Sequence, residues 1–203
     1  MDERIKMGQQ NLAPIVLFVY DRLDHARKTI SALKLNDLAC LSELYVYSDD
    51  AKLSNSRTKV DEVREYLKTV TGFKKITIIE RDKNWGLANS IIDGVSSIVK
   101  IYGKIIVLED DLVTSKYFLQ YMNDSLVAYE NEKSVWQVGG YMPNVELNSE
   151  QQIVFLPYTT SWGWATWVDR WREFDRDPNT LIKDMSDHDI YKFNMNGAVN
   201  IWS

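Results

Sequence analysis

Short apolar segments alternate with segments of helical periodicity along the first two thirds of the chain. The run Pro14–Tyr20 is almost entirely apolar, which is typical of a strand covered on both faces of a parallel sheet. Apolar residues recur at helical spacing in the segment that follows, 21–35. The same alternation predicts further strands at 44–47, 75–80, 104–108 and 135–141, and further helices at 60–70, 87–102 and 117–130. This order predicts an α/β fold of βαβ units around a mostly parallel sheet.

Two glycines are expected to end helices, and the pattern becomes less regular after residue 140. Gly72 and Gly103 are expected to terminate the helices before them, because glycine readily adopts the left-handed conformation of a C-cap. Beyond residue 140 the alternation weakens. A loop and a short strand are expected at 143–156, and a helix at 165–174 with its tryptophans on one side.

Composition narrows the class of protein. The 203 residues suffice for one full domain or two small ones, and 45% hydrophobic with 26% charged residues indicates a folded chain. The net charge of -5 argues against nucleic acid as the main partner. The run 13–20 is too short to span a membrane, and the first twelve residues lack the apolar core of a secretory signal. With a single cysteine, the chain is predicted to be cytoplasmic.

Acidic residues follow four of the predicted strands. In an open parallel sheet these strand ends meet at one edge, where ligands bind. Such an accumulation of negative charge is costly unless a cation or a donor-rich ligand neutralises it, and a divalent metal is the simplest explanation. The strand ends concerned are Tyr20-Asp21-Arg22, Ser48-Asp49-Asp50, Glu80-Arg81-Asp82 with Asn84-Trp85-Gly86, and Glu109-Asp110-Asp111.

The triplet Glu109-Asp110-Asp111 is the sharpest of these signals. Successive side chains of an extended segment alternate in direction, so Glu109 and Asp111 can share a side while Asp110 points elsewhere. Carboxylate oxygens together with phosphate oxygens suit Mg²⁺ or Mn²⁺ bound as a nucleotide complex. The alternative is that the three acids are merely solvated residues at a strand end.

Other catalytic patterns are missing from the sequence. No GxxxxGK[ST] or GxGxxG loop is present, which disfavours P-loop and dinucleotide-binding enzymes. Cys40 lies among apolar residues and is predicted to be a core residue. His25 and His188 lack metal-site spacing and are expected to be structural or solvent-exposed.

The acidic triplet and a downstream tryptophan block together resemble a known family. Glu109-Asp110-Asp111 after an apolar strand, with Ser161-Trp162-Gly163-Trp164-Ala165-Thr166-Trp167 further on, is similar to the GT-A fold glycosyltransferases. The resemblance is to N-acetylglucosaminyltransferase I and bacterial family 2-like sugar transferases, and it covers about 14–174. It implies a Rossmann-like three-layer sandwich with a nucleotide-sugar-binding part at 13–142. The start of an acceptor part would occupy 143–203, in one C-terminally truncated domain.

The resemblance also implies roles for individual residues. Asp111 would coordinate Mn²⁺ or Mg²⁺ on the diphosphate, Asp110 would meet the ribose, and Glu109 would reach the transferred sugar. The remaining assignments are Asp49 on the uracil ring, Tyr20, Arg22, Asn84 and Asn89 beside the nucleotide, and Trp162, Gly163 and Trp164 on the acceptor side. Trp167 and Trp171 are instead expected to be core residues.

The general base of such a transfer is hard to find in this sequence. In the family it is an aspartate near a downstream tryptophan, where this chain has Asn200-Ile201-Trp202-Ser203. Asparagine cannot accept the proton, and Asp187 and Asp189 are weak substitutes.

The expected function is therefore inverting, metal-dependent transfer of a sugar from a UDP-sugar to an acceptor hydroxyl. The acceptor would be a glycan or a lipid-linked glycan of surface-polysaccharide assembly, with possible peripheral membrane association. Two alternatives stay open: a non-catalytic nucleotide-sugar-binding module of the same fold, and a nucleotidyltransferase. The second would need a Gly-rich basic loop after the first strand, which 20–24 does not supply.

Overall fold

The chain folds around one six-stranded sheet with helices on both faces. The computed structural model describes residues 11–142, 153–183 and 185–194. The strands are β1 (Ile15–Val19), β2 (Glu43–Ser48), β3 (Lys75–Glu80), β4 (Lys104–Glu109), β5 (Val138–Gly139) and β6 (Trp164–Trp167). The helices are α2 (Leu23–Lys34), α3 (Arg57–Leu67), α4 (Leu87–Tyr102), α5 (Phe118–Ala128), α6 (Val168–Trp171), α7 (Pro178–Lys183) and α8 (Asp187–Phe193), with short 3₁₀ turns at Ala39–Leu41 and Ser54–Ser56.

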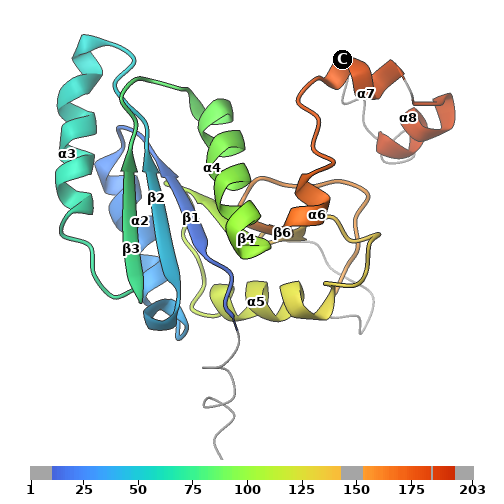
Figure 1. Cartoon of the computed structure of the whole chain (residues 1–203), viewed down its shortest axis with the longest axis horizontal. Helices are drawn as coiled ribbons and strands as arrows, with labels where there is room; N and C mark the ends of the chain where they lie inside the picture. Colours follow the sequence, from blue (N-terminus) through green and yellow to red (C-terminus); the bar gives the residue numbers. More distant parts are fainter. Residues whose placement is uncertain (1–10, 143–152, 184, 195–203) are drawn as a thin grey trace, which may run out of the picture.

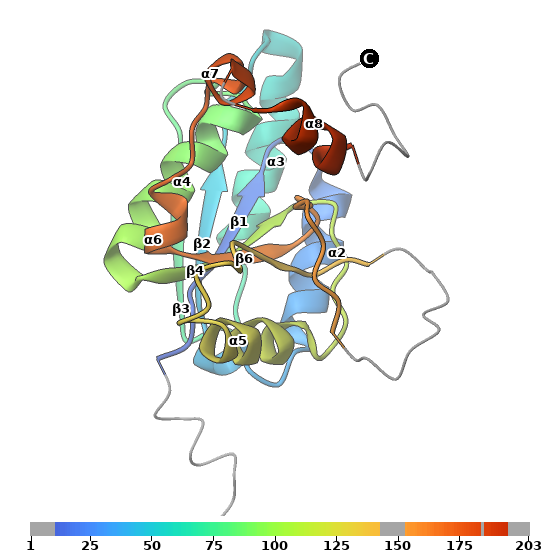
Figure 2. The same ribbon diagram turned by 90° about the vertical axis from the view of Figure 1, so that its right-hand side faces the viewer.

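The strand order is β3-β2-β1-β4-β6-β5, in which β1 to β4 are parallel and β6 runs antiparallel to both β4 and β5. The chain therefore moves outward from β1 to β3 and then returns to the other side of β1. Because crossover connections are right-handed, this reversal places α4 on the face opposite α2 and α3. Figure 2 shows α4 and α2 on opposite sides of the sheet.

Each face of the sheet has its own hydrophobic core. Ile15 and Leu17 of β1 pack with α2, α3 and α5, whereas Val16 and Phe18 pack with α4. The alternation of faces follows from the pleat of the strand. The predicted α/β class, a Rossmann-like three-layer sandwich with a mostly parallel central sheet, is confirmed.

The sequence-based boundaries are good for the first four strands and weaker afterwards. Gly103 is the left-handed C-cap of α4, as predicted (φ 77°). The C-cap of α3 is Lys68, so the prediction for Gly72 was wrong. The strand expected at 135–141 is limited to Val138–Gly139.

The helix expected at 165–174 was wrong in its first half. Trp164–Trp167 is strand β6, which pairs with β4, and only Val168–Trp171 is helical. Trp164, Trp167 and Trp171 are spaced as in a helix, but hydrogen bonding to the open edge of β4 outweighs this local pattern. Beyond α6, Figure 1 shows α7 and α8 set apart from the sheet.

Candidate nucleotide-sugar site at the carboxyl edge of the sheet

The candidate site lies where the order of the strands reverses. β1 pairs with β2 on one side and with β4 on the other, so the connections leave the carboxyl ends of β1 and β4 in opposite directions. Such a switch point opens a crevice at the sheet edge, the usual ligand site of doubly wound folds. Tyr20–Arg22 and Glu109–Asp111 border it from the two strands, because Phe18 is level with Glu109.

The three acids of the triplet lie in different environments. Ile105 and Val107 face α4, and Glu109 continues this series by the alternation of the strand. Asp110 follows directly after the strand and is buried, with 2% exposure. Its main-chain oxygen accepts a hydrogen bond from Thr29 Oγ1 of α2 at 2.8 Å. The side chain of Asp111 is 40% exposed. Of the two aspartates in the triplet, Asp111 is therefore the one whose carboxylate is accessible to a ligand.

Arg22 ties the two strand ends together. Its guanidinium donates a hydrogen bond to Asp110 and forms an ion pair with Asp111, with Nη1 3.2 Å from Oδ2. The main-chain N–H of Tyr20 also donates to Asp110 Oδ2 at 3.4 Å. Asp110 therefore acts mainly as an anchor that orients Arg22 across the switch point.

Burial makes negative charge costly at this edge. Desolvation raises the pKa of Glu109, and the charges of Asp111 and Asp110 raise it further. Desolvation also raises the pKa of Asp110, against the lowering effect of Arg22. An added cation or a donor-rich ligand would relieve this cost.

Asp49 holds the loop that begins α4. Its Oδ1 accepts from the main-chain N–H groups of Trp85 (2.8 Å) and Asp50 (3.0 Å), and its Oδ2 accepts from Gly86 (2.9 Å). Three of its four acceptor positions are thus used, which leaves one on Oδ2 for a ligand N–H. Asn84 supports the same loop through Nδ2, which donates to the carbonyl of Asp50 at 2.6 Å.

Two further predicted site residues bind the protein rather than point into open space. The Tyr20 hydroxyl accepts from the Lys52 N–H (3.0 Å) and donates to Ser56 Oγ (3.1 Å), which fixes the loop after β2. Asn89 is exposed, and its Nδ2 donates to the carbonyl of Trp85 at 2.7 Å. Their predicted contact with a nucleotide stays a prediction.

Three arginines to which the sequence assigned no role, Arg57, Arg64 and Arg81, form ion pairs with acidic residues at or near these strand ends. Asp50 is 8% exposed and forms ion pairs with Arg57 (2.8 Å) and Arg64 (3.3 Å). Arg81 pairs with Asp93 and lies over the Trp85 ring, 4.0 Å from its centroid. Arginine side chains therefore neutralise much of the negative charge of the clustered carboxylates.

The Asp50–Arg57 pair gives a test of this compensation. The hydrogen bond from Arg57 holds the pKa of Asp50 below its ordinary value, so the pair stabilises the folded state above that value and loses its effect as pH falls through the lowered pKa. We expect Arg57→Gln to lower the melting temperature at pH 7 and to lower it less at pH 3. Thermal denaturation at both pH values measures this. Arg57 has a second partner, Asp61, whose Oδ1 lies 3.6 Å from Arg57 Nη1, and Asp61→Asn is the control for this contact. An equal loss of melting temperature in Arg57→Gln at both pH values would contradict the role of Asp50.

The tryptophan block lies beside the triplet. The antiparallel register sets Trp164, the first residue of β6, opposite Val107, which lies two residues before Glu109 in β4. Trp162 is 54% exposed, Trp164 is partly buried, and Gly163 is buried with a φ of 70°. Trp167 is a core residue, as predicted (3% exposed).

The two candidate bases lie at the start of α8. Asp189 Oδ2 accepts from Ser186 N–H (3.0 Å) and Oγ (2.6 Å) at the start of α8, and these bonds lower its pKa, which weakens it as a base. Asp187 is exposed on the same turn. His25 and His188 are exposed, as expected. The segment 200–203 lies outside the described residues.

The prediction for Cys40 was wrong. Cys40 is exposed, because the short turn Ala39–Leu41 directs Ala39 into the core instead. Leu38, just before the turn, is also buried. An apolar neighbourhood in sequence therefore did not place Cys40 in the core.

The donor chemistry fits a nucleotide-bound divalent ion. Within the described residues no group of three or more His, Cys, Asp or Glu side chains could hold a metal by itself. Mn²⁺ and Mg²⁺ bound with nucleotides need only one or two carboxylates, since phosphates and waters complete their shell. The half-exposed carboxylate of Asp111 is a donor of this kind.

Comparison with known proteins finds similarity in structure only. No family model matches the sequence, and no curated protein does. The chain is similar to the mannosyltransferase PcManGT from Pyrobaculum calidifontis in complex with GDP-Man and Mn²⁺, with 13% identity, a TM-score of 0.48 and coverage of 81% of this chain and 50% of that one. It is also similar to S. aureus TarS 1–349, with 12% identity, a TM-score of 0.44 and coverage of 75% and 47%. The chain spans about half the length of these proteins.

None of the helices in the part of the chain that the structure describes is long and apolar enough to cross a membrane.

Proposed function

We propose that the chain is the donor-binding part of a GT-A glycosyltransferase that transfers a sugar from a UDP-sugar to an acceptor hydroxyl, with inversion. The observation that carries this proposal is the acidic triplet Glu109–Asp111 facing Tyr20–Arg22 across the switch point of the sheet. Donor binding belongs to 13–142, and the acceptor part begins within 143–203.

Different residues at the sheet edge would bind different parts of the donor. Asp111 would hold Mn²⁺ or Mg²⁺ on the diphosphate; when bound, the ion would stabilise the negative charge that develops on the leaving phosphate. Arg22, oriented by Asp110, brings a second positive charge to the same edge. Glu109 lies on the α4 face and would accept a hydrogen bond from the transferred sugar. The free acceptor position on Asp49 Oδ2 suits the N–H of uracil.

The acceptor side is the exposed tryptophan block. Trp162 is 54% exposed, and Gly163 connects it to Trp164, the first residue of β6, which pairs with β4. A glycan or lipid-linked glycan is the proposed acceptor. Peripheral membrane association and a cytoplasmic location remain predictions.

A second candidate function is a nucleotide-sugar-binding module without transfer. The observation that favours it is that Asp189, one of the two candidate bases, is engaged in capping α8. UDP-sugar hydrolysis separates the two functions. Release of UDP that requires Mn²⁺ and is lost in Asp187→Asn or Asp189→Asn supports the transferase, whereas tight UDP-sugar binding without release supports the module.

The metal role of Asp111 has a direct test. We expect Asp111→Asn to weaken Mn²⁺-dependent UDP binding about tenfold or more, because one charged oxygen ligand of the ion is lost. Calorimetric titration of UDP with and without Mn²⁺ measures the change. Asp124→Asn is the control, because Asp124 is an exposed acid on α5 that accepts hydrogen bonds from Gln120. Unchanged UDP affinity in Asp111→Asn would remove Asp111 from the site.

A further inference from the structure

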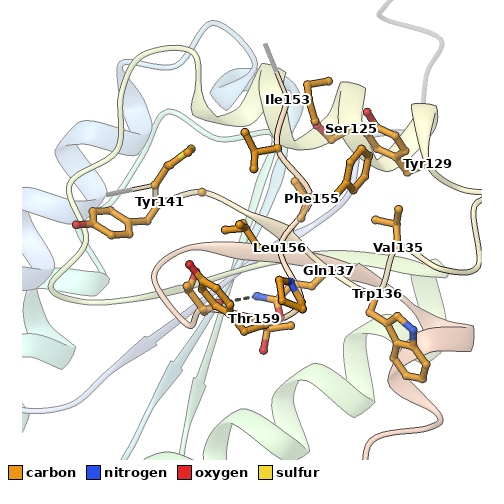
Figure 3. Close-up of a pocket in the computed structure, with 18 of the residues that line it drawn as sticks. Ser125, Tyr129, Val135, Trp136, Gln137, Tyr141, Ile153, Phe155, Leu156 and Thr159 are labelled. Carbon is orange, nitrogen blue, oxygen red and sulfur yellow. Dashed lines mark hydrogen bonds between the residues drawn. The ribbon is translucent and has the colours of Figure 1, made fainter. Parts of the chain in front are cut away.

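A second concave site lies beside the tryptophan block. It is a pocket of about 550 Å³ between α5 and the two segments 134–142 and 153–160. Figure 3 shows its side chains, with Tyr141 at one end, Trp136 at the other and Phe155 between them. This volume is in the range of pockets that bind small molecules.

The described lining of this pocket contains no charged side chain. None of its described lining residues is Asp, Glu, Lys, Arg or His, although 26% of the chain is charged. Its polar groups are the hydroxyls of tyrosine, serine and threonine residues and the amide of Gln137. Burial raises the pKa of Tyr121, so this phenol stays neutral as well.

Large apolar faces are exposed around the same pocket. Phe155 is 64% exposed, Trp136 52% and Tyr141 46%. Contiguous exposed apolar surface of this kind marks a binding site. Gln137 Nε2 donates to the Thr160 carbonyl (2.6 Å), which joins the two segments.

We propose that this pocket binds a neutral oligosaccharide, namely the acceptor sugars remote from the reacting hydroxyl. This inference rests on the proposed function, and it adds the class of acceptor and a place for it. Aromatic faces pack against the C–H faces of sugars, while uncharged hydroxyl and amide groups match sugar hydroxyls. The pocket is continuous with the tryptophan block of the proposed acceptor side, because the Tyr141 and Trp162 ring centroids are 4.5 Å apart.

The lining disfavours other ligands. A phosphate or an acidic sugar would need a cationic partner, which the described lining lacks. A lipid chain would leave polar groups of the lining, such as the hydroxyl of Thr159, facing hydrocarbon, which is unfavourable.

The test is binding of the full chain to an array of neutral and acidic oligosaccharides, followed by calorimetry with the neutral oligosaccharide that binds most tightly. We expect Trp136→Ala and Phe155→Ala each to weaken this binding at least about fivefold, through loss of one aromatic contact. Trp136→Phe is expected to recover most of the affinity. Tyr191→Ala, an aromatic of similar exposure on α8 (52%), is the matched control and should bind as the wild type does.

Several results would overturn the proposal. They are no binding to any neutral oligosaccharide, binding to acidic glycans alone, preference for neutral phosphatidylcholine vesicles, and unchanged affinity in both alanine variants. The melting temperature of each variant verifies that it is folded. Mn²⁺-dependent UDP binding of the wild type is measured separately. Its absence together with oligosaccharide binding would reject the proposed function but leave the pocket's ligand class intact.

Discussion

We expect Asp49→Asn to lower the free energy of unfolding by about 2 to 4 kcal/mol, although the two side chains have the same size. The carboxylate of Asp49 accepts three main-chain N–H groups with both of its oxygens. Asparagine keeps one acceptor oxygen and sets an NH₂ donor against the N–H of Trp85 or Gly86. Because Asp49 is 7% exposed, water cannot readily replace the lost bond.

The same substitution should weaken UDP binding. Gly86, with a φ of 73°, is the N-cap of α4. Asp49 accepts hydrogen bonds from Trp85 and Gly86 and so holds the loop that leads from β3 into α4 at the carboxyl edge of the sheet. Urea denaturation measures the stability, and calorimetry with UDP and Mn²⁺ measures the affinity. Asp61→Asn on the exposed side of α3 is the matched control (54% side-chain exposure) and should change neither. A stability loss below about 0.5 kcal/mol would show that these hydrogen bonds are dispensable.

The sheet could be predicted from the sequence because its strands carry a local signal. Ile15–Val19 and Lys104–Glu109 are apolar over several consecutive residues, as buried parallel strands require. Trp164–Trp167 carries no such signal. Its strand form depends on pairing with β4, which lies about sixty residues earlier in the chain, so local spacing predicted a helix instead.

The site could be predicted in part for a similar reason. Parallel strands and a reversal of strand order bring Arg22 and Glu109–Asp111 together, and both follow from the order of the elements. The ion pairs of Asp50 with Arg57 and Arg64 could not be predicted from the order of the elements, because ion pairs depend on side-chain positions. One signal was present: Arg57 and Arg64 are seven residues apart in α3 and so share a face of the helix.

We expect Arg170→Met to cost about 3 to 5 kcal/mol of unfolding free energy, the largest effect of any single change discussed for this chain. Arg170 is 5% exposed, and its guanidinium lies over the Trp167 ring, 4.3 Å from the centroid. It donates hydrogen bonds to four main-chain carbonyls between α5 and β5. These belong to Tyr129 (3.1 Å), Glu130 (2.8 Å), Glu132 (3.1 Å) and Val135 (3.3 Å).

Methionine would fill most of the space of Arg170 but would remove its hydrogen bonds to these four carbonyls, of which those of Tyr129 and Glu132 would keep a main-chain partner. Asp169 would lose one of its two cations. Arg170→Lys keeps the charge but cannot reach all four carbonyls, so an intermediate loss is expected. Urea denaturation measures both, with the exposed neighbour Arg172→Met as control. If Arg170→Met costs less than about 1 kcal/mol, the 129–135 segment is held by other contacts. Because this segment leads directly into the pocket wall at 134–142, the expected loss would also loosen the aromatic wall formed by Trp136 and Tyr141.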